Sequence, residues 1–271
     1  MTSRALGTLP NAPLAYVLAQ VRFQPILEMH KAVPAIQTAL RKRYPRFREI
    51  KIAGFELGPT GPRVLEPAPR WEFVSESSRQ GVILQSNSLV LHATEYSTYQ
   101  NFGADLATVV KILENQVEGI LVDRLGLRYV DLIVPRPGES LDAYVVQSLA
   151  ATPDPGIEFA RHSGVTVADY TINDGGRLVI RFTRGKGVPP LPPDLQPLDL
   201  DPSDIMGRSD IGNVDCALLD TDRFHETTVP FVADDLCRRF HVLHEHISSA
   251  FKSLSTAYAR EVWSQQKGDK P

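Results

Sequence analysis

Few cysteines, no long apolar run and little net charge characterise this 271-residue chain. Its two cysteines, Cys216 and Cys237, can form neither a disulfide framework nor a four-thiolate zinc site by themselves. No stretch approaches the ~18 uncharged apolar residues of a transmembrane helix, and the N-terminal residues lack the apolar run of a signal peptide. These absences predict a cytoplasmic protein that makes no contact with a membrane.

The charge balance is close to neutral. The chain has 29 Lys and Arg against 32 Asp and Glu, which gives a net charge of −3. Such a chain, taken as a whole, is not a typical nucleic-acid binder, although a local patch could still be one. Apolar residues make up 42% and charged residues 23%, so the composition predicts a folded globular protein.

Sequence motifs of common enzymes are also missing. The chain has no phosphate-binding glycine loop, no dinucleotide-binding glycine pattern and no Gly-x-Ser-x-Gly elbow. His241, His244 and His246 lie close together, but a zinc site needs three or four convergent ligands, and packing along a helix explains them better. We therefore predict no cofactor and no metal, and favour a protein that is not an enzyme.

The apolar periodicity predicts strands and helices in a repeated order. Residues 14–23 alternate as in a strand, three further strands follow at about 70–95, and a long amphipathic helix spans about 98–122. A second series starts with a strand at 125–134, continues with a short helix at 139–149 and a hairpin that turns at Asn173–Gly176, and ends in a long helix. Each half thus predicts an α+β unit, in two tandem β-α-β(3–4)-α repeats (1–123 and 124–271) whose antiparallel sheets are covered by long helices, as in helix-grip or TATA-binding-protein-like folds.

A proline-rich insertion interrupts the second half at about 185–207. Its six prolines exclude a helix or a central strand and favour an extended conformation. Two interpretations stay open: the insertion packs on the body of the protein, or it is an arm that binds a partner or clasps a dimer.

Two arginines occupy matching strands of the predicted repeats. Arg22 and Arg128 each lie in an apolar context, and a buried arginine costs several kcal/mol unless it is paired. Either each has a carboxylate partner, or both face a groove and bind an anion or a partner molecule. The carboxylates considered as partners are Asp131, Asp220, Asp222 and Glu95.

The candidate binding residues follow from this choice. A ligand cavity between sheet and helix would be lined by Trp71, Phe73, Tyr96 and Tyr129, with an arginine as its polar anchor. The candidate binding residues are therefore two arginines, two aromatic residues and one carboxylate: Arg22, Arg128, Tyr129, Trp71 and Asp222.

A local basic patch stands out against the near-neutral total. Six basic residues fall within eleven positions, whereas ten acidic and two basic residues lie between positions 199 and 235. The patch favours a solvated helix end, with nucleic-acid binding as the alternative. Its members are Arg41, Lys42, Arg43, Arg46, Arg48 and Lys51.

Several separate stretches of the chain carry a resemblance to known proteins. These stretches are residues 9–14 with 20–23, residues 94–96 with Tyr99 and Phe102, residues 124–130, residues 219–223, and residues 243–244 with Phe251. Together they resemble a sporadically distributed family of bacterial and archaeal proteins of about the same length, with no assigned activity. The resemblance carries over no catalytic residue, and the family's scattered occurrence implies mobile or defence-linked genes.

Three functions remain as hypotheses. The first is a non-enzymatic protein that binds another macromolecule, a protein partner or a second copy of itself, as part of a toxin–antitoxin or phage-defence module. The second is a helix-grip-like domain that binds or hydrolyses a small molecule. The third is nucleic-acid binding through the basic patch at 41–51, which the overall charge does not favour.

Overall fold

The computed structural model describes residues 9–52, 55–58, 61–64, 67–150, 163–195, 199–202, 212 and 214–265. Its central strand is the one that the sequence predicts first. β1 (Leu14–Phe23) pairs antiparallel with β7 (Ser88–Ala93) on one side and with β8 (Leu121–Ile133) on the other. Side chains of a strand point alternately to opposite faces, so β1 sends Val17, Ala19 and Val21 into the main core and Gln20 and Arg22 to the other side.

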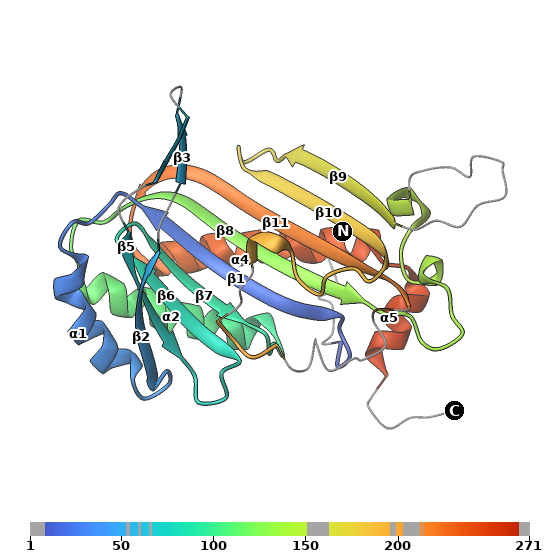
Figure 1. Cartoon of the computed structure of the whole chain (residues 1–271), viewed down its shortest axis with the longest axis horizontal. Coiled ribbons are helices and arrows are strands. Elements are labelled where there is room, and N and C mark those ends of the chain that lie inside the picture. Colours follow the sequence, from blue (N-terminus) through green and yellow to red (C-terminus); the bar gives the residue numbers. More distant parts are fainter. Residues whose placement is uncertain are drawn as a thin grey trace.

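Nine strands form one antiparallel sheet in the order β2-β5-β6-β7-β1-β8-β11-β10-β9 (Figure 1). The remaining strands of this sheet are β2 (Arg46–Ile52), β5 (Ala68–Val74), β6 (Gln80–Gln85), β9 (Ser163–Thr171), β10 (Arg177–Lys186) and β11 (Asp215–Pro230). A separate hairpin consists of β3 (Phe55–Gly58) and β4 (Gly61–Val64). The described helices are α1 (Met29–Leu40), α2 (Tyr99–Gln116), α4 (Ala233–Leu254) and α5 (Ala257–Ser264).

The α+β class is confirmed, but the prediction of two tandem repeats with their own helix-covered sheets, helix-grip or TATA-binding-protein-like, is wrong. A single nine-stranded sheet runs through both halves, because Leu18 of β1 lies opposite Arg128 of β8. The predicted boundary between residues 123 and 124 falls inside β8. β1 lies between β7 and β8, and β8 lies between β1 and β11, so neither is an edge strand.

The second half also lacks the short helix predicted at 139–149. Two 3₁₀ turns, η1 (Leu141–Ala143) and η2 (Gln147–Ala150), take its place. Ser140 caps the first turn by accepting a hydrogen bond from the backbone N–H of Asp142 at 3.2 Å. Residues 141–150 thus form two short turns instead of an α-helix. Tyr144, which follows the first turn, is fully buried.

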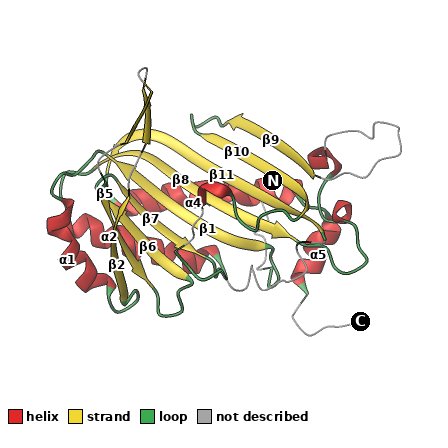
Figure 2. Ribbon diagram, in the orientation of Figure 1, coloured by secondary structure: helices red, strands yellow, loops and turns green. Residues whose placement is uncertain are grey.

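Helices cover one face of the sheet, which we call the helix face (Figure 2). Of the two N-cap residues that the sequence favours for this helix, Ser97 and Thr98, the structure has Thr98, which accepts a hydrogen bond from Asn101 N–H at 3.2 Å. The buried stripes of α2 and α4 meet the main core on this face. These stripes are Phe102, Leu106, Val109, Val110 and Leu113 of α2 and Leu236, Phe240, Leu243 and Ile247 of α4.

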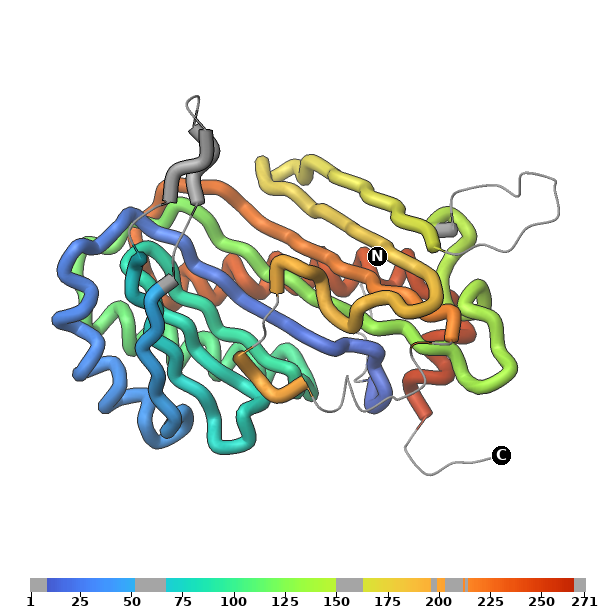
Figure 3. The backbone as a smooth tube through the Cα atoms, viewed as in Figure 1, coloured from blue at the N-terminus to red at the C-terminus, as the bar shows by residue number. Residues whose placement is uncertain are grey.

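The opposite face, which we call the open face, is crossed by described parts of the proline-rich insertion (Figure 3). We name residues 187–195 and 199–202 the strap; they include the third 3₁₀ turn, η3 (Pro193–Leu195). Val188 and Leu191 pack in a small cluster with Tyr16, Val130 and other open-face residues, and Leu200 is buried too. The strap therefore packs on the body of the protein. Among the described residues, no helix combines the length and the apolar character needed to cross a membrane.

Candidate functional site

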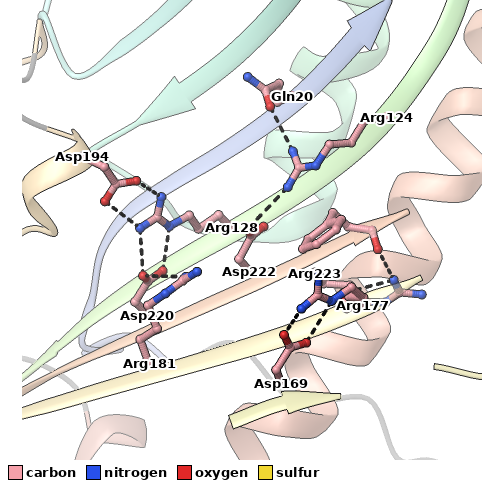
Figure 4. A network of polar contacts seen from close by, with 11 residues as sticks. Gln20, Arg124, Arg128, Asp169, Arg177, Arg181, Asp194, Asp220, Asp222 and Arg223 are labelled. Atoms are coloured by element: carbon pink, nitrogen blue, oxygen red, sulfur yellow. Dashed lines mark hydrogen bonds and ion pairs between the residues drawn. The ribbon is translucent and has the colours of Figure 1, made fainter. Parts of the chain in front are cut away.

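Arg128 is the centre of a network of charged groups on the open face (Figure 4). It lies on β8 and contacts two aspartates from different parts of the chain. Its Nε and Nη2 donate to Asp220 on β11 at 2.7 and 2.8 Å, and its Nη1 and Nη2 donate to Asp194 of the strap at 2.5 and 3.1 Å. Both carboxylates thus accept two hydrogen bonds from one guanidinium, the geometry that makes such pairs strong.

The network keeps Arg128 charged although it is largely buried. Burial lowers its pKa, but the hydrogen bonds that it donates to Asp220 and Asp194 outweigh this effect and raise the pKa above its usual value. The same hydrogen bonds lower the pKa of Asp194 against the effect of burial. Arg181 of β10 lies 3.4 Å from the second oxygen of Asp220. The carboxylate pairing considered for Arg128 is therefore present, with Asp220 as one of the partners named from the sequence.

A second group of polar residues lies further along β1 and β8. Arg124 donates to Gln20 Oε1 at 3.0 Å and to Asp222 at 3.4 Å, and its guanidinium carbon lies 4.3 Å from the centre of the Phe224 ring. A side chain at Gly126 would collide with this guanidinium, because a Cβ there would lie 2.6 Å from Arg124 Nη1. Burial raises the pKa of Asp222 and lowers that of Arg124.

Arg22 lies beside this group, but its side chain has a different environment. It is exposed and lies directly opposite Arg124 in the strand pairing, so two positive charges face each other. Opposed like charges on neighbouring strands are unfavourable. Within the described ranges the guanidinium of Arg22 makes no hydrogen bond or ion pair, although its backbone takes part in the strand pairing. Of the other carboxylates considered as partners, Asp131 lies on the helix face, beyond the reach of either arginine.

The strap makes a further set of ion pairs at the other end of the open face. Asp199 pairs with Arg70 of β5 and lies 3.4 Å from Arg48 of β2. Arg48 donates to Glu72 at 2.7 Å, and burial followed by the hydrogen bond with Asp199 raises the pKa of Glu72.

Near these ion pairs, His92 of β7 is fully buried. Its Nδ1 lies 2.9 Å from the hydroxyl of Tyr16. Burial lowers the pKa of His92 to about 3, so the ring is neutral at ordinary pH.

Two candidate binding residues, Trp71 and Tyr129, lie on the helix face instead. Trp71 is buried in the main core and donates its ring N–H to Glu49 at 3.1 Å. The hydroxyl of Tyr129 lies 3.0 Å from that of Tyr96 and 3.1 Å from Nδ1 of His244. Trp71, Phe73 and Tyr129 belong to the main core cluster, and Tyr96 packs against it. The side chains predicted to line a cavity therefore make core contacts.

The histidines of α4 have separate partners. His244 stacks on Tyr99 with ring centres 4.0 Å apart, and burial lowers its pKa to about 4. His246 accepts a hydrogen bond from Arg223 at 3.1 Å, and His241 lies 3.8 Å from Glu245. Over the residues that the structure describes, no three His, Cys, Asp or Glu side chains are grouped so as to hold a metal ion.

Arg223 is a buried charge that the sequence reasoning missed. It is fully buried on the helix face and pairs with Asp174 of the β9–β10 turn. Its Nη1 also donates to the carbonyl of Phe224 at 2.5 Å. Strand alternation could have shown its position. Asp220 and Asp222 share one face of β11, so Arg223 must lie on the opposite face.

The basic patch is divided between two parts of the chain, and strand alternation places Lys51 on the other face of the sheet from Arg46 and Arg48. Arg41, Lys42 and Arg43 follow α1, whereas Arg46, Arg48 and Lys51 lie on the edge strand β2. Arg43 contacts Asp105 at 2.5 Å and Arg46 donates to Ser78 at 2.6 Å, so part of the positive charge is already paired. All six side chains are exposed.

Comparison with known proteins adds no relative. No family model matches the chain, and no match is found among curated proteins. The likeness to a sporadically distributed family stays an expectation from the sequence.

Proposed function

We infer that the chain is a non-enzymatic binding protein whose open face receives an extended acidic segment of a partner protein. One observation carries this proposal: the same face already holds such a segment of the chain itself. The strap region, residues 187–202, contains three aspartates and no basic residue. Asp194 and Asp199 of this segment pair with Arg128 and Arg70 on strands of the sheet.

The part of the open face around Arg22 offers the next binding position. Arg22 is exposed and opposes Arg124, and a carboxylate placed between the two would relieve their repulsion. Gln20, already bonded to Arg124, supplies an amide beside them. Arginine is enriched in protein interfaces, since its planar group binds carboxylates through two hydrogen bonds.

The charge balance favours a protein over a nucleic acid as the partner. Asp220, Asp222 and Glu72 lie among the arginines of the open face, and they would repel a continuous phosphate backbone. A protein segment can match alternating charges one by one. That the partner belongs to a toxin–antitoxin or phage-defence module, and that it is met in the cytoplasm, stay predictions from the sequence.

The test compares two charge reversals in the full tagged chain, purified gently from its native host. Arg22→Glu changes the open face, and Arg41→Glu is the matched control in the basic patch. Arg22→Glu places a carboxylate opposite Arg124, so we expect it to fold as well as the wild type. We expect a stoichiometric protein partner with the wild type and with Arg41→Glu, and its loss with Arg22→Glu.

Each other outcome contradicts the proposal. A partner that is lost with Arg41→Glu and kept with Arg22→Glu would place binding at the basic patch. Co-purified nucleic acid, visible in the 260/280 nm absorbance ratio, would support the third hypothesis. A chain that carries neither protein nor nucleic acid would argue against a resident partner.

A further inference from the structure

The two edge strands of the sheet differ in a way that points to a second copy of this chain. β2, at one edge, carries four charged residues in seven, which is a common protection against pairing with another strand. β9, at the other edge, carries one, Asp169, whose charge is paired with Arg177 of β10. Val165, Val167 and Tyr170 of β9 are 68%, 61% and 51% exposed.

The backbone of β9 shows which of its groups are free for pairing. The N–H of Ile172 donates to the carbonyl of Gly176 and so points towards β10. N–H and C=O groups alternate in direction along a strand, and the pairing of β9 with β10 has no register shift. Residues 163, 165, 167, 169 and 171 therefore direct their backbone groups away from the sheet.

These five residues are symmetric about Val167. Two β9 strands can pair antiparallel with the two-fold axis at Val167. Residue 165 then lies opposite residue 169 of the other copy, and residue 163 lies opposite residue 171. Each backbone N–H or C=O that points away from β10 therefore lies opposite such a group of the other copy. In the same register Gly164 lies opposite Tyr170 of the other copy, whose ring can cover the backbone at this glycine. Asp169 lies opposite Val165, and no two like charges face each other.

We propose that two copies of the chain associate through β9, in this register, to form one continuous sheet across a two-fold axis. The partner is a second copy and not an unrelated strand, because both the outward backbone groups and the side chains of β9 are complementary to themselves. The surface is separate from the strap and from Arg22, so the dimer does not depend on the proposed binding function.

The experiment measures the native mass of the full chain by light scattering and sedimentation. The wild type should have twice the mass of the 30.0 kDa chain. Val167→Lys places two positive charges opposite each other on the axis and should give a monomer. Val242→Lys, a matched change of an exposed valine on α4, should remain a dimer.

Two further variants separate loss of pairing from loss of fold. Val167→Pro removes an N–H that points away from β10, so the strand should stay in the sheet while the dimer is lost. Val167→Cys should form a covalent dimer on oxidation, because Cα atoms of a hydrogen-bonded antiparallel pair are about 5.5 Å apart, within disulfide range. A monomeric wild type, or a dimer that survives both Val167→Lys and Val167→Pro, would overturn the proposal.

Discussion

The two faces of the sheet are closed by different means. On the helix face, α2 and α4 bury continuous apolar stripes against the strands. On the open face, the strap is held by a few apolar anchors, among them Leu191, and by ion pairs from Asp194 and Asp199. Apolar burial is the larger source of stability, whereas partly exposed ion pairs contribute little net energy but fix position. The helix face thus holds the fold through apolar burial, whereas the open face fixes the position of an acidic segment through charge.

A matched pair of leucines tests this contrast most strongly. Leu243 of α4 and Leu191 of the strap are almost equally buried, at 3% and 4% exposed. The cost of Leu→Ala depends on how far the surroundings can collapse into the cavity, and a strap can move more easily than a helix–sheet core. We expect Leu243→Ala to lower the free energy of unfolding by about 4–5 kcal/mol and Leu191→Ala by about 2 kcal/mol. Urea unfolding measures both, and equal losses would remove the contrast.

The second prediction concerns the buried charge on the open face. Arg128→Met leaves Asp220, which is 3% exposed, with only the more distant Arg181. Removing one partner of a buried ion pair typically costs about 3–5 kcal/mol, and Arg181 should keep the loss near the lower value. Arg128→Met combined with Asp220→Leu should recover most of the stability in urea unfolding. A double variant as unstable as the single one would show that the pair is not coupled.

Asp131, on the helix face, should make the protein less stable as the pH rises. Burial raises its pKa to about 8, far above the value of about 4 in an unfolded chain. The folded state therefore keeps a proton that the unfolded state loses, and stability falls between pH 4 and pH 8. Asp131→Asn should remove this fall and raise the free energy of unfolding at pH 8 by about 5 kcal/mol, at about 1.36 kcal/mol for each unit of pKa. Urea unfolding at pH 5 and pH 8 checks it; an unchanged slope would contradict the assignment.

His92, on the open face, should act in the opposite direction. Its folded pKa of about 3 lies below the unfolded value of about 6.5. Stability is then complete above pH 6.5 and falls as the pH decreases towards 3, by about 2 kcal/mol near pH 5. His92→Gln should lose this part of the acid sensitivity. His244, whose pKa is also lowered, is the control, since His244→Gln should remove only its own share.

Local elements were predictable because their signals lie within a few residues. The alternation of residues 14–23, the cap at Thr98 and the Asn173–Gly176 turn all appear in the structure, with Gly175 at a φ of +86°. The single sheet was not predictable in this way. The pairing of Leu18 with Arg128 joins strands that are 110 residues apart, and the order of elements is the same for one sheet or two.

The charged network was predictable in part for the same reason. Asp220 was among the carboxylates named as possible partners of Arg128, and the structure pairs the two. Asp194 could not be named, because the docking of the strap depends on apolar contacts that no short pattern encodes. Asp131 was named among possible arginine partners, but strand alternation from Tyr129 places it on the helix face, which is why it is buried without an arginine.

The smallest effect on stability should come from loosening the strap itself. Asp199 is partly exposed and its pair with Arg70 is open to solvent, so Asp199→Asn should lower the free energy of unfolding by only about 1 kcal/mol or less. The effect should instead be local. The amide of Asp201 donates to the carbonyl of Ser78 at 2.7 Å and reports directly on strap opening. We expect its hydrogen exchange to become about five-fold faster, while the amides of α4 on the helix face keep their wild-type rates. Equal acceleration on both faces would mean that the strap opens only when the whole sheet unfolds, and the two faces would then not differ in local stability.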